Sequence, residues 1–256
     1  MHPEHRGQGI ATQLAAWRID YARQKLGEDV AILASIQEKN SSSMAAATKW
    51  SHQILGHYVS CALPVLQKLA YQGNYFFRIV NESELETIAN GLNLFYQDYN
   101  LHIPETGETL AAWLQQSPLE RPFRQYHVVT DKQDNILAGL AVAEQCRVVS
   151  MHVSSMPGWM KGLNKIVKMV PPDGVLRQLS VSKFWFQQGE QEAARALWEH
   201  VRFAYGDLGS HLTYSYDPHG PMPDILKVPI WLPKAQFAVY SAPQIDVSGE
   251  KLLVAL

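Results

Sequence analysis

The sequence has few cysteines and no long apolar run. Its two cysteines, Cys61 and Cys146, lie far apart, so their spacing matches neither a metal site nor a disulfide framework. We expect both to be buried small hydrophobic residues in a reducing compartment, the cytoplasm. The longest apolar runs are too short to cross a bilayer, and no signal peptide is visible. These absences favour a cytoplasmic protein without a metal site or an integral membrane segment.

Excess charge of one sign is also lacking. The formal net charge is −2 at pH 7, which gives no electrostatic reason to expect a nucleic-acid or anionic-membrane partner. The 46% hydrophobic and 18% charged content is ordinary for a globular protein, and the 256 residues allow one large or two small domains. Seven Trp, eleven Tyr and eight Phe supply enough apolar area for a packed core.

A glycine-containing turn opens the chain and leads directly into a helical pattern. Apolar side chains recur at steps of four, three and four, which places them on one face of a helix: Ile10, Leu14, Trp17 and Tyr21. Gly27 follows a last turn that carries Arg23 and Lys25, so the helix is expected to end there.

The start of this helix is a predicted anion site. The first N–H groups of a helix have no internal partner and lie at the positive end of its dipole. Gly7 and Gly9 have no Cβ, so an anion can approach the backbone closely. The P-loop pattern is excluded because Ile10 follows Gly9, and the dinucleotide pattern is excluded because Thr12 replaces its third glycine and no strand precedes the turn.

The pattern Arg6-x-x-Gly9-x-Ala11, preceded by Pro3-Glu4, resembles motif A of the GNAT superfamily of acyl-CoA-dependent N-acyltransferases. In that family the motif Q/R-x-x-G-x-G/A holds the pyrophosphate of coenzyme A. The resemblance implies that acetyl-CoA phosphates are bound by Arg6, Gly7, Gln8, Gly9, Ile10, Ala11 and Thr12. The simpler alternative is an ordinary helix N-terminus with a chance pair of glycines.

The next segment extends the resemblance to motif B. Residues 29–36 are expected to form a buried strand, followed by a helix over 44–50. Asn40 matches the Asn of motif B, which implies a role in holding the cofactor or the splayed strand, and Ser43 matches its small residue. Two features depart from the family: Ala47 stands where a leaving-group Tyr is frequent, and Ser51-His52 stand where Gly-Phe is frequent. Tyr58 is a displaced candidate, but an aromatic residue in a strand is the simpler interpretation.

The strand that precedes the glycine turn in this family is not present. Only Met1-His2 precede Pro3, so the backbone donor and the Glu base that the family places on that strand are missing. Either the true start lies upstream, or the sheet is completed in another way. An open sheet edge beside an apolar face promotes association, so the expected partners include the second half of the chain or another copy.

The rest of the chain alternates strand and helix patterns. Residues 85–99 repeat apolar side chains at helical spacing after the capping box of Ser83 and Glu86, and a shorter helix is expected over 109–116. Residues 147–174 are expected to be an insertion whose helix has Lys161, Lys165 and Lys168 opposite an apolar face packed on a core. Strands are expected at 76–80, 125–130, 136–142, 175–181, 211–216 and 236–240, with a helix from 188 and a rigid loop over 217–223.

This order of elements resembles a second GNAT unit. At the corresponding turn, Gly189 is followed by Glu190 and Glu192, whose charge opposes a pyrophosphate. We therefore expect a tandem arrangement: a partial GNAT unit over 1–74 that lacks its N-terminal strands, and a degenerate unit without CoA over 75–256. The implied fold is α/β (α+β), with a mixed, mostly antiparallel sheet flanked by helices.

Three functions are consistent with these features. The first is an N-acetyltransferase that transfers acetyl from acetyl-CoA to a small-molecule or peptide amine by direct attack. The second is a non-catalytic CoA-binding or interaction module of the same fold, and the third is a dinucleotide-dependent oxidoreductase. The sequence assigns no catalytic base; the histidines near the turn are His2, His5, His52 and His57, and Cys61 has no neighbour that would lower its pKa.

Overall fold

The computed structural model describes residues 2–5, 7–67, 74–167, 169–249 and 251–253. The first part of the chain forms helix α1 (Ile10–Leu26), strand β1 (Ile32–Gln37), helix α2 (Ser41–Ala47) and the long strand β2 (Gln53–Pro64). Strand β1 begins three residues later than the expected 29–36, and helix α2 begins three residues earlier than the expected 44–50. The helix begins early because the Asn40 side chain caps it.

The second part contains the remaining elements of the fold. Its strands are β3 (Phe76–Ile79), β4 (Tyr99–Asn100), β5 (Arg124–Thr130), β6 (Ile136–Ala143), β7 (Met151–His152), β8 (Val175–Leu176), β9 (Gln178–Phe186), β10 (His211–Tyr216), β11 (Lys234–Ala242) and β12 (Lys251–Leu252). Its helices are α3 (Leu85–Tyr96), α4 (Gly107–Gln115), α5 (Gly158–Val167), α6 (Gln191–Ala204) and α7 (Met222–Leu226). Helix α7 begins inside the segment predicted to be a rigid loop.

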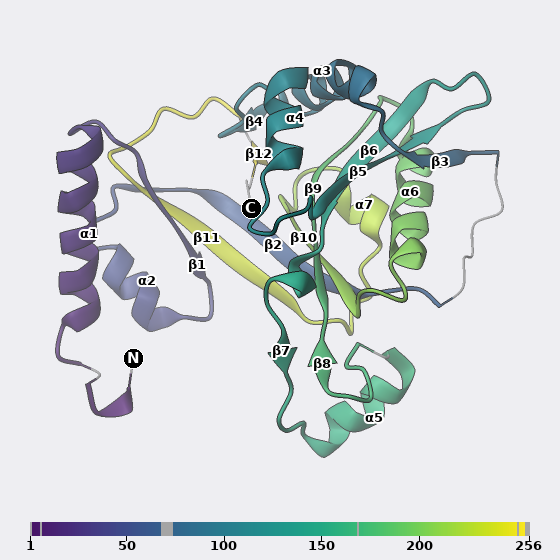
Figure 1. Ribbon diagram of the computed structural model, residues 1–256. Helices are drawn as coiled ribbons and strands as arrows, with labels where there is room; N and C mark the ends of the chain where they lie inside the picture. The colour runs from purple at the N-terminus through teal and green to yellow at the C-terminus, as the bar shows by residue number, and fades with distance from the viewer. Residues whose placement is uncertain (1, 6, 68–73, 168, 250, 254–256) are drawn as a thin grey trace.

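One eight-stranded sheet in the order β1-β11-β2-β10-β9-β6-β5-β3 links both parts of the chain. All neighbouring pairs are antiparallel except β9 and β10, which run parallel. This confirms the predicted mixed, mostly antiparallel sheet flanked by helices. Figure 1 shows the sheet crossing the molecule, with α3 and α4 above it and α6 beside it.

The late strand β11 is inserted between two early strands. Strand β11 runs antiparallel to both: Ala242 lies opposite Ile32 of β1, and Lys234 lies opposite Cys61 of β2. The early strand β2 in turn pairs with β10. Strands from the predicted 1–74 and 75–256 units therefore lie side by side in one sheet.

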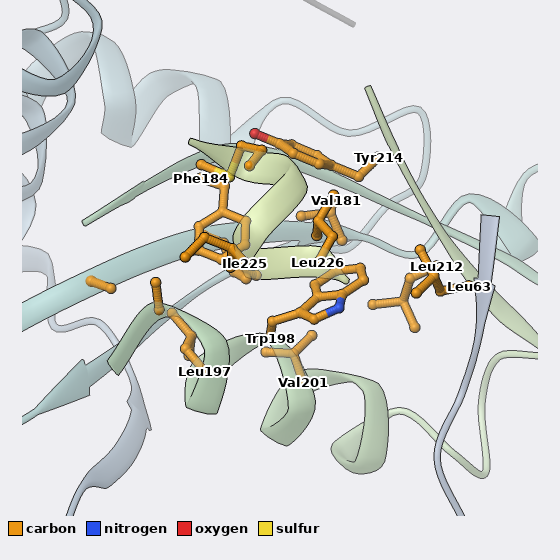
Figure 2. Packing of buried hydrophobic residues seen from close by; sticks show 14 of the residues in the cluster. Leu63, Val181, Phe184, Leu197, Trp198, Val201, Leu212, Tyr214, Ile225 and Leu226 are labelled. Atoms are coloured by element: carbon orange, nitrogen blue, oxygen red, sulfur yellow. The ribbon is translucent and has the colours of Figure 1, made fainter. Parts of the chain in front are cut away.

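Helices α6 and α3–α4 cover opposite faces of the sheet. Adjacent residues of β5 separate the two layers, because Val129 packs in the cluster with α6 and Val128 packs in the cluster with α3 and α4. Figure 2 shows Trp198 of α6 surrounded by side chains from β2, β9, β10 and α7, among them Leu63, Val181, Leu212 and Leu226. Trp198 is 1% exposed, so its large apolar surface anchors α6 to the sheet.

The insertion at 147–174 carries α5, closed at its base by the pairing of β7 with β8. Lys161 and Lys165 are exposed as predicted, whereas Lys168 lies outside the described residues. The expectation that Met160 packs on a core is wrong, because Met160 is exposed, as is the neighbouring Trp159. The insertion projects away from the sheet (Figure 1).

Helix α1 has the predicted bounds but an uncovered apolar face. Leu14 is 51% exposed and Trp17 is 61% exposed, with Ile10 and Tyr21 also exposed. Ile19 is the one buried residue of the helix. None of the described helices combines the length and apolarity that crossing a bilayer requires.

Candidate functional site

The turn before α1 has the backbone geometry of an open cradle. Gly7 and Gly9 have φ angles of 79° and 74°, in the left-handed region that favours glycine. A Cβ at Gly7 would meet no atom within 4 Å, and one at Gly9 would meet the Gln13 amide nitrogen at 3.9 Å. The backbone here is therefore shaped by glycine and open to an approaching group.

The first amides of α1 have no partner in the part of the chain that the structure describes. The first helical bond runs from Gln13 N to Gly9 O at 3.0 Å, and no side chain caps the helix. Among the described residues, nothing accepts a hydrogen bond from the N–H groups of Ile10, Ala11 and Thr12. Residues 7–11 are exposed and Thr12 is half-buried, so three amides and the positive end of a 17-residue helix face an open turn.

The other predicted residues of this site are Gln8, Arg6 and Asn40. The Gln8 side chain donates to Glu4 O at 3.3 Å, which folds it back onto the turn. Arg6 lies outside the described residues. Asn40 Oδ1 accepts from Ser43 N at 3.1 Å and so caps α2; a cofactor contact by Asn40 stays a prediction.

Ala47 stands at the position of the family's tyrosine and has no hydroxyl group of its own. Ala47 is buried against Ala238 and Tyr240, so its methyl group is part of the packing between α2 and the sheet. Tyr58 is also buried and stacks on Phe237 with ring centroids 4.9 Å apart, which confirms it as an aromatic residue in a strand.

The histidines and cysteines form no catalytic cluster among the described residues. His2, His5 and His52 are exposed, and His57 Nε2 lies 3.7 Å from Glu38 Oε1. Cys61 is buried, and burial raises the pKa of its thiol to about 12, so it is not a thiolate at neutral pH. Cys146 is half-buried and therefore less enclosed than predicted; burial likewise raises the pKa of its thiol.

The corresponding turn of the second part is shaped similarly but carries acidic residues. Gly189 has a φ of 91° and precedes α6, with Glu190 at the N-cap and Glu192 in the first turn. No side-chain cap is present there either. Carboxylates complement the helix dipole in this position and repel an anionic ligand.

A cleft that our sequence analysis missed lies where β9 and β10 diverge. The two strands pair only from His211–Gln178 to Thr213–Ser180, and a cavity of about 200 Å³ opens beyond that point, under α3 and α4. The full lining is Leu92, Tyr96, Leu101, His102, Ile103, Glu105, Trp113, Val181, Ser182, Lys183, Tyr214, Ser215 and Leu253. The one sequence signal was Lys183, a charged residue near the middle of an apolar strand.

Comparison with known protein families gives a match over the first part of the chain. Residues 1–51 match the family model described as "Acetyltransferase (GNAT) family". No curated protein matches the chain.

Solved structures share the fold over nearly the whole chain. A GCN5-related N-acetyltransferase from Sphaerobacter thermophilus gives a TM-score of 0.60 at 12% identity, covering 97% of this chain and 73% of that one. N-myristoyltransferase from Saccharomyces cerevisiae, solved with bound myristoyl-CoA and inhibitors, gives 0.59 at 8% identity, covering 94% and 58%. A GCN5-related N-acetyltransferase from Anabaena variabilis gives 0.48 at 11% identity, covering 93% and 52%. The chain thus spans between about half and three quarters of the length of these proteins.

Proposed function

We propose that the chain transfers an acyl group from acyl-CoA to an amine. The match of residues 1–51 to the GNAT family model and the shared fold support this proposal. We further propose acetyl-CoA as the donor and a small molecule or peptide as the acceptor. A cytoplasmic setting is part of the proposal and is supported by two free thiols, Cys61 and Cys146.

The observation that carries the proposal is the uncapped start of α1. The amides of Ile10, Ala11 and Thr12, which have no partner among the described residues, follow two glycines held at positive φ. Most exposed helix starts use a Ser, Thr, Asp or Asn side chain to satisfy such amides. A pyrophosphate would satisfy them instead, with Arg6 adding a charge-assisted contact and Gly7 and Gln8 closing the turn.

The chain's own residues would bind and orient the donor. A bound acyl-CoA supplies a thioester carbon that an amine can attack directly. The gain from such a site comes mainly from orientation and from stabilising charge on the thioester oxygen. Asn40 Oδ1 caps α2, and the Asn40 side-chain N–H groups stay part of our proposed donor site.

A second candidate is an acyl-CoA-binding module without turnover. The buried Ala47 favours it, because a methyl group packed against Ala238 cannot protonate a leaving thiolate. Isothermal titration with acetyl-CoA, beside a free-CoA release assay over a panel of amines, separates the two. Binding with release supports the transferase, and binding without release supports the module.

The substitution Thr12→Glu tests the cradle. A carboxylate in the first turn of α1 is favourable to the helix dipole, by about 0.3–1 kcal/mol, so folding is preserved. The same carboxylate repels a diphosphate, and we expect acetyl-CoA affinity to fall about tenfold or more, by roughly 1.4 kcal/mol. Titration calorimetry of acetyl-CoA and of myristoyl-CoA measures the change for a short and a long acyl chain.

Gln24→Glu is the matched control, because it makes the same charge change at the exposed C-terminal end of α1. It should leave the affinity within about twofold, since surface charges at such a distance are largely screened by salt. Equal effects of the two variants, or acyl-CoA binding unaffected by Thr12→Glu, would remove the turn from the donor site.

A further inference from the structure

The insertion at 147–174 has large apolar side chains on its surface. Trp159 of α5 is 72% exposed, and the neighbouring Met160 is 39% exposed. Where the chain enters the insertion, Val149 is 59% exposed and Met151 of β7 is 43% exposed. Exposed apolar side chains that gather on one segment mark a candidate interaction surface.

The same insertion is basic, although the whole chain has a formal net charge of −2. Residues 145–172 contain no Asp or Glu, and their cations are Arg147, Lys161, Lys165 and Lys168. The Arg147 guanidinium is paired with Glu144. In contrast, Lys161 and Lys165 are exposed and form no ion pair with the described residues. Two cations of α5 are therefore available to an anionic partner.

The apolar and basic side chains lie on different sides of α5. Lys161 and Lys165 are four residues apart, so they share one side of the helix. Trp159 precedes Lys161 by two residues, which at about 100° per residue places these two side chains on opposite sides. Helices with tryptophan on one side and lysine on the other are typical of segments that lie in the interface of a membrane.

Hydrogen bonds within the insertion hold α5 in this exposed position. The pairing of β7 with β8 continues in the bond from Val153 N to Gly174 O at 2.9 Å. Asn164 of α5 then fixes the segment after the helix, because its side chain donates to Val170 O at 2.7 Å and accepts from Val170 N at 2.8 Å. Figure 1 shows α5 at the end of the molecule opposite α3 and α4. A helix that projects in this way can contact a flat surface before the sheet does.

We propose that α5 attaches the chain to an anionic phospholipid surface. Trp159 and Met160 enter the boundary between the headgroups and the acyl chains, and Lys161 and Lys165 extend to the lipid phosphates. Charge complementarity favours this partner, because an anionic lipid surface attracts a helix whose charged side chains are all cations. The attachment is peripheral, since α5 has 10 residues and a helix needs about 20 to span a bilayer.

Cosedimentation of the full chain with lipid vesicles tests the proposal. Phosphatidylcholine vesicles with about one third phosphatidylglycerol provide the anionic surface, and pure phosphatidylcholine vesicles provide the neutral one. We expect binding to the anionic vesicles at low ionic strength to be at least about tenfold stronger than to the neutral vesicles, and to weaken as salt is added. The proposal is overturned if the anionic vesicles do not bind the chain, or if both kinds of vesicle bind it equally.

The double substitution Lys161→Gln with Lys165→Gln removes the two cations of α5. Each lysine near an anionic surface contributes about fivefold in affinity, so this variant should bind the anionic vesicles about 25-fold more weakly. Lys49→Gln with Lys132→Gln is the matched control, because it makes the same charge change at exposed sites outside the insertion. The control should bind within about twofold of the unmodified chain. Equal losses in the two variants would overturn the assignment to α5.

The substitution Trp159→Ser removes the apolar anchor. Because Trp159 is exposed, the melting temperature should stay unchanged while binding to anionic vesicles weakens about tenfold. Trp231→Ser is the matched control, since Trp231 is 54% exposed and lies outside the insertion; it should leave binding unchanged. Equal losses in the two variants would contradict the proposal.

The conservative substitution Trp159→Phe locates the contact directly. It keeps an aromatic ring, so binding should stay within about threefold. The blue shift of tryptophan emission that anionic vesicles produce in the unmodified chain should disappear in this variant. A blue shift that persists would show that another tryptophan meets the lipid and would overturn the proposal. A change in the sedimentation of the lipid-free chain in Trp159→Ser would also overturn it, because a second copy of the chain would then cover α5.

Discussion

At the scale of single residues, burial dominates the ionisable groups of the sheet. His127 is 8% exposed, and its Nε2 lies 2.9 Å from the Tyr205 hydroxyl, which donates to Gln125 Oε1 at 2.9 Å. This network leaves the Tyr205 oxygen to accept from His127 Nε2–H. Burial, reinforced by the nearby His200, lowers the pKa of His127 to about 4.

The His127 pKa predicts a loss of stability in mild acid. The unfolded chain takes up a proton near pH 6.5, whereas the folded chain does so only near pH 4. The stabilising contribution is therefore complete above pH 6.5 and is lost as the pH falls to 4, amounting to at most about 3 kcal/mol. Urea unfolding between pH 7 and pH 4 measures this slope. The substitution His127→Gln should flatten the dependence of the unfolding free energy on pH. The control His5→Gln, at an exposed site, should leave this dependence unchanged. An unchanged dependence in His127→Gln would show that other groups control it.

At the scale of elements, local signals were enough to predict most helices. Gly9 and Gly27 bound α1 as predicted, and the apolar repeat of α3 lies in the core through Ile88 and Leu92. The match of residues 1–51 to the GNAT family model and the mixed sheet also followed from short motifs and element order. The predicted CoA contacts of Arg6 through Thr12 and of Asn40 stay predictions.

Elements that depend on distant partners could not be predicted. Strand β12 has two residues and pairs with β4, which lies about 150 positions earlier. The Lys183–Glu105 pair joins residues 78 positions apart, and no local pattern reports such a contact. Strand β11 was predicted as a strand, but its place between β1 and β2 depends on which edges remain open after the rest of the sheet has formed.

The glycine inside α3 has a packing reason that predicts a reversed substitution effect. A Cβ at Gly91 would lie 2.3 Å from the indole of Trp185, which is 3% exposed. In an open helix position, Gly→Ala stabilises by about 1 kcal/mol. At Gly91 the clash should cost about 1–3 kcal/mol and outweigh that gain, so Gly91→Ala should lower the free energy of unfolding.

Gly162 in α5 is the matched control for Gly91, because a Cβ there would meet no atom within 4 Å. Gly162→Ala should raise the free energy of unfolding by about 0.5–1 kcal/mol. Urea denaturation of both variants compares the two directly. A stabilising Gly91→Ala would mean that Trp185 can move away at little cost.

At the scale of the whole molecule, one sheet contains strands from both parts of the chain. β11 cannot occupy its position until both β1 and β2 are present, since it pairs with each of them. Among the described residues, the outer strands of this sheet are β1 and β3. The β1 edge lies on the side of the molecule that carries α1 (Figure 1), whose apolar face has no partner among the described residues.

This combination predicts that the chain self-associates through α1 and the edge of β1. An uncovered apolar helix face beside an unpaired strand is a site of association. Trp17 and Leu14 are the most exposed residues of the helix repeat, at 61% and 51%, so Leu14→Glu with Trp17→Glu should shift the chain to a monomer in sedimentation velocity at tens of micromolar. Ala16→Glu, an exposed site of the same helix between these two positions, is the control and should leave the association intact. The prediction fails if the unmodified chain is monomeric at 100 μM. It also fails if Ala16→Glu disrupts association as much as Leu14→Glu with Trp17→Glu does, because added charge and not loss of the apolar face would then explain the effect.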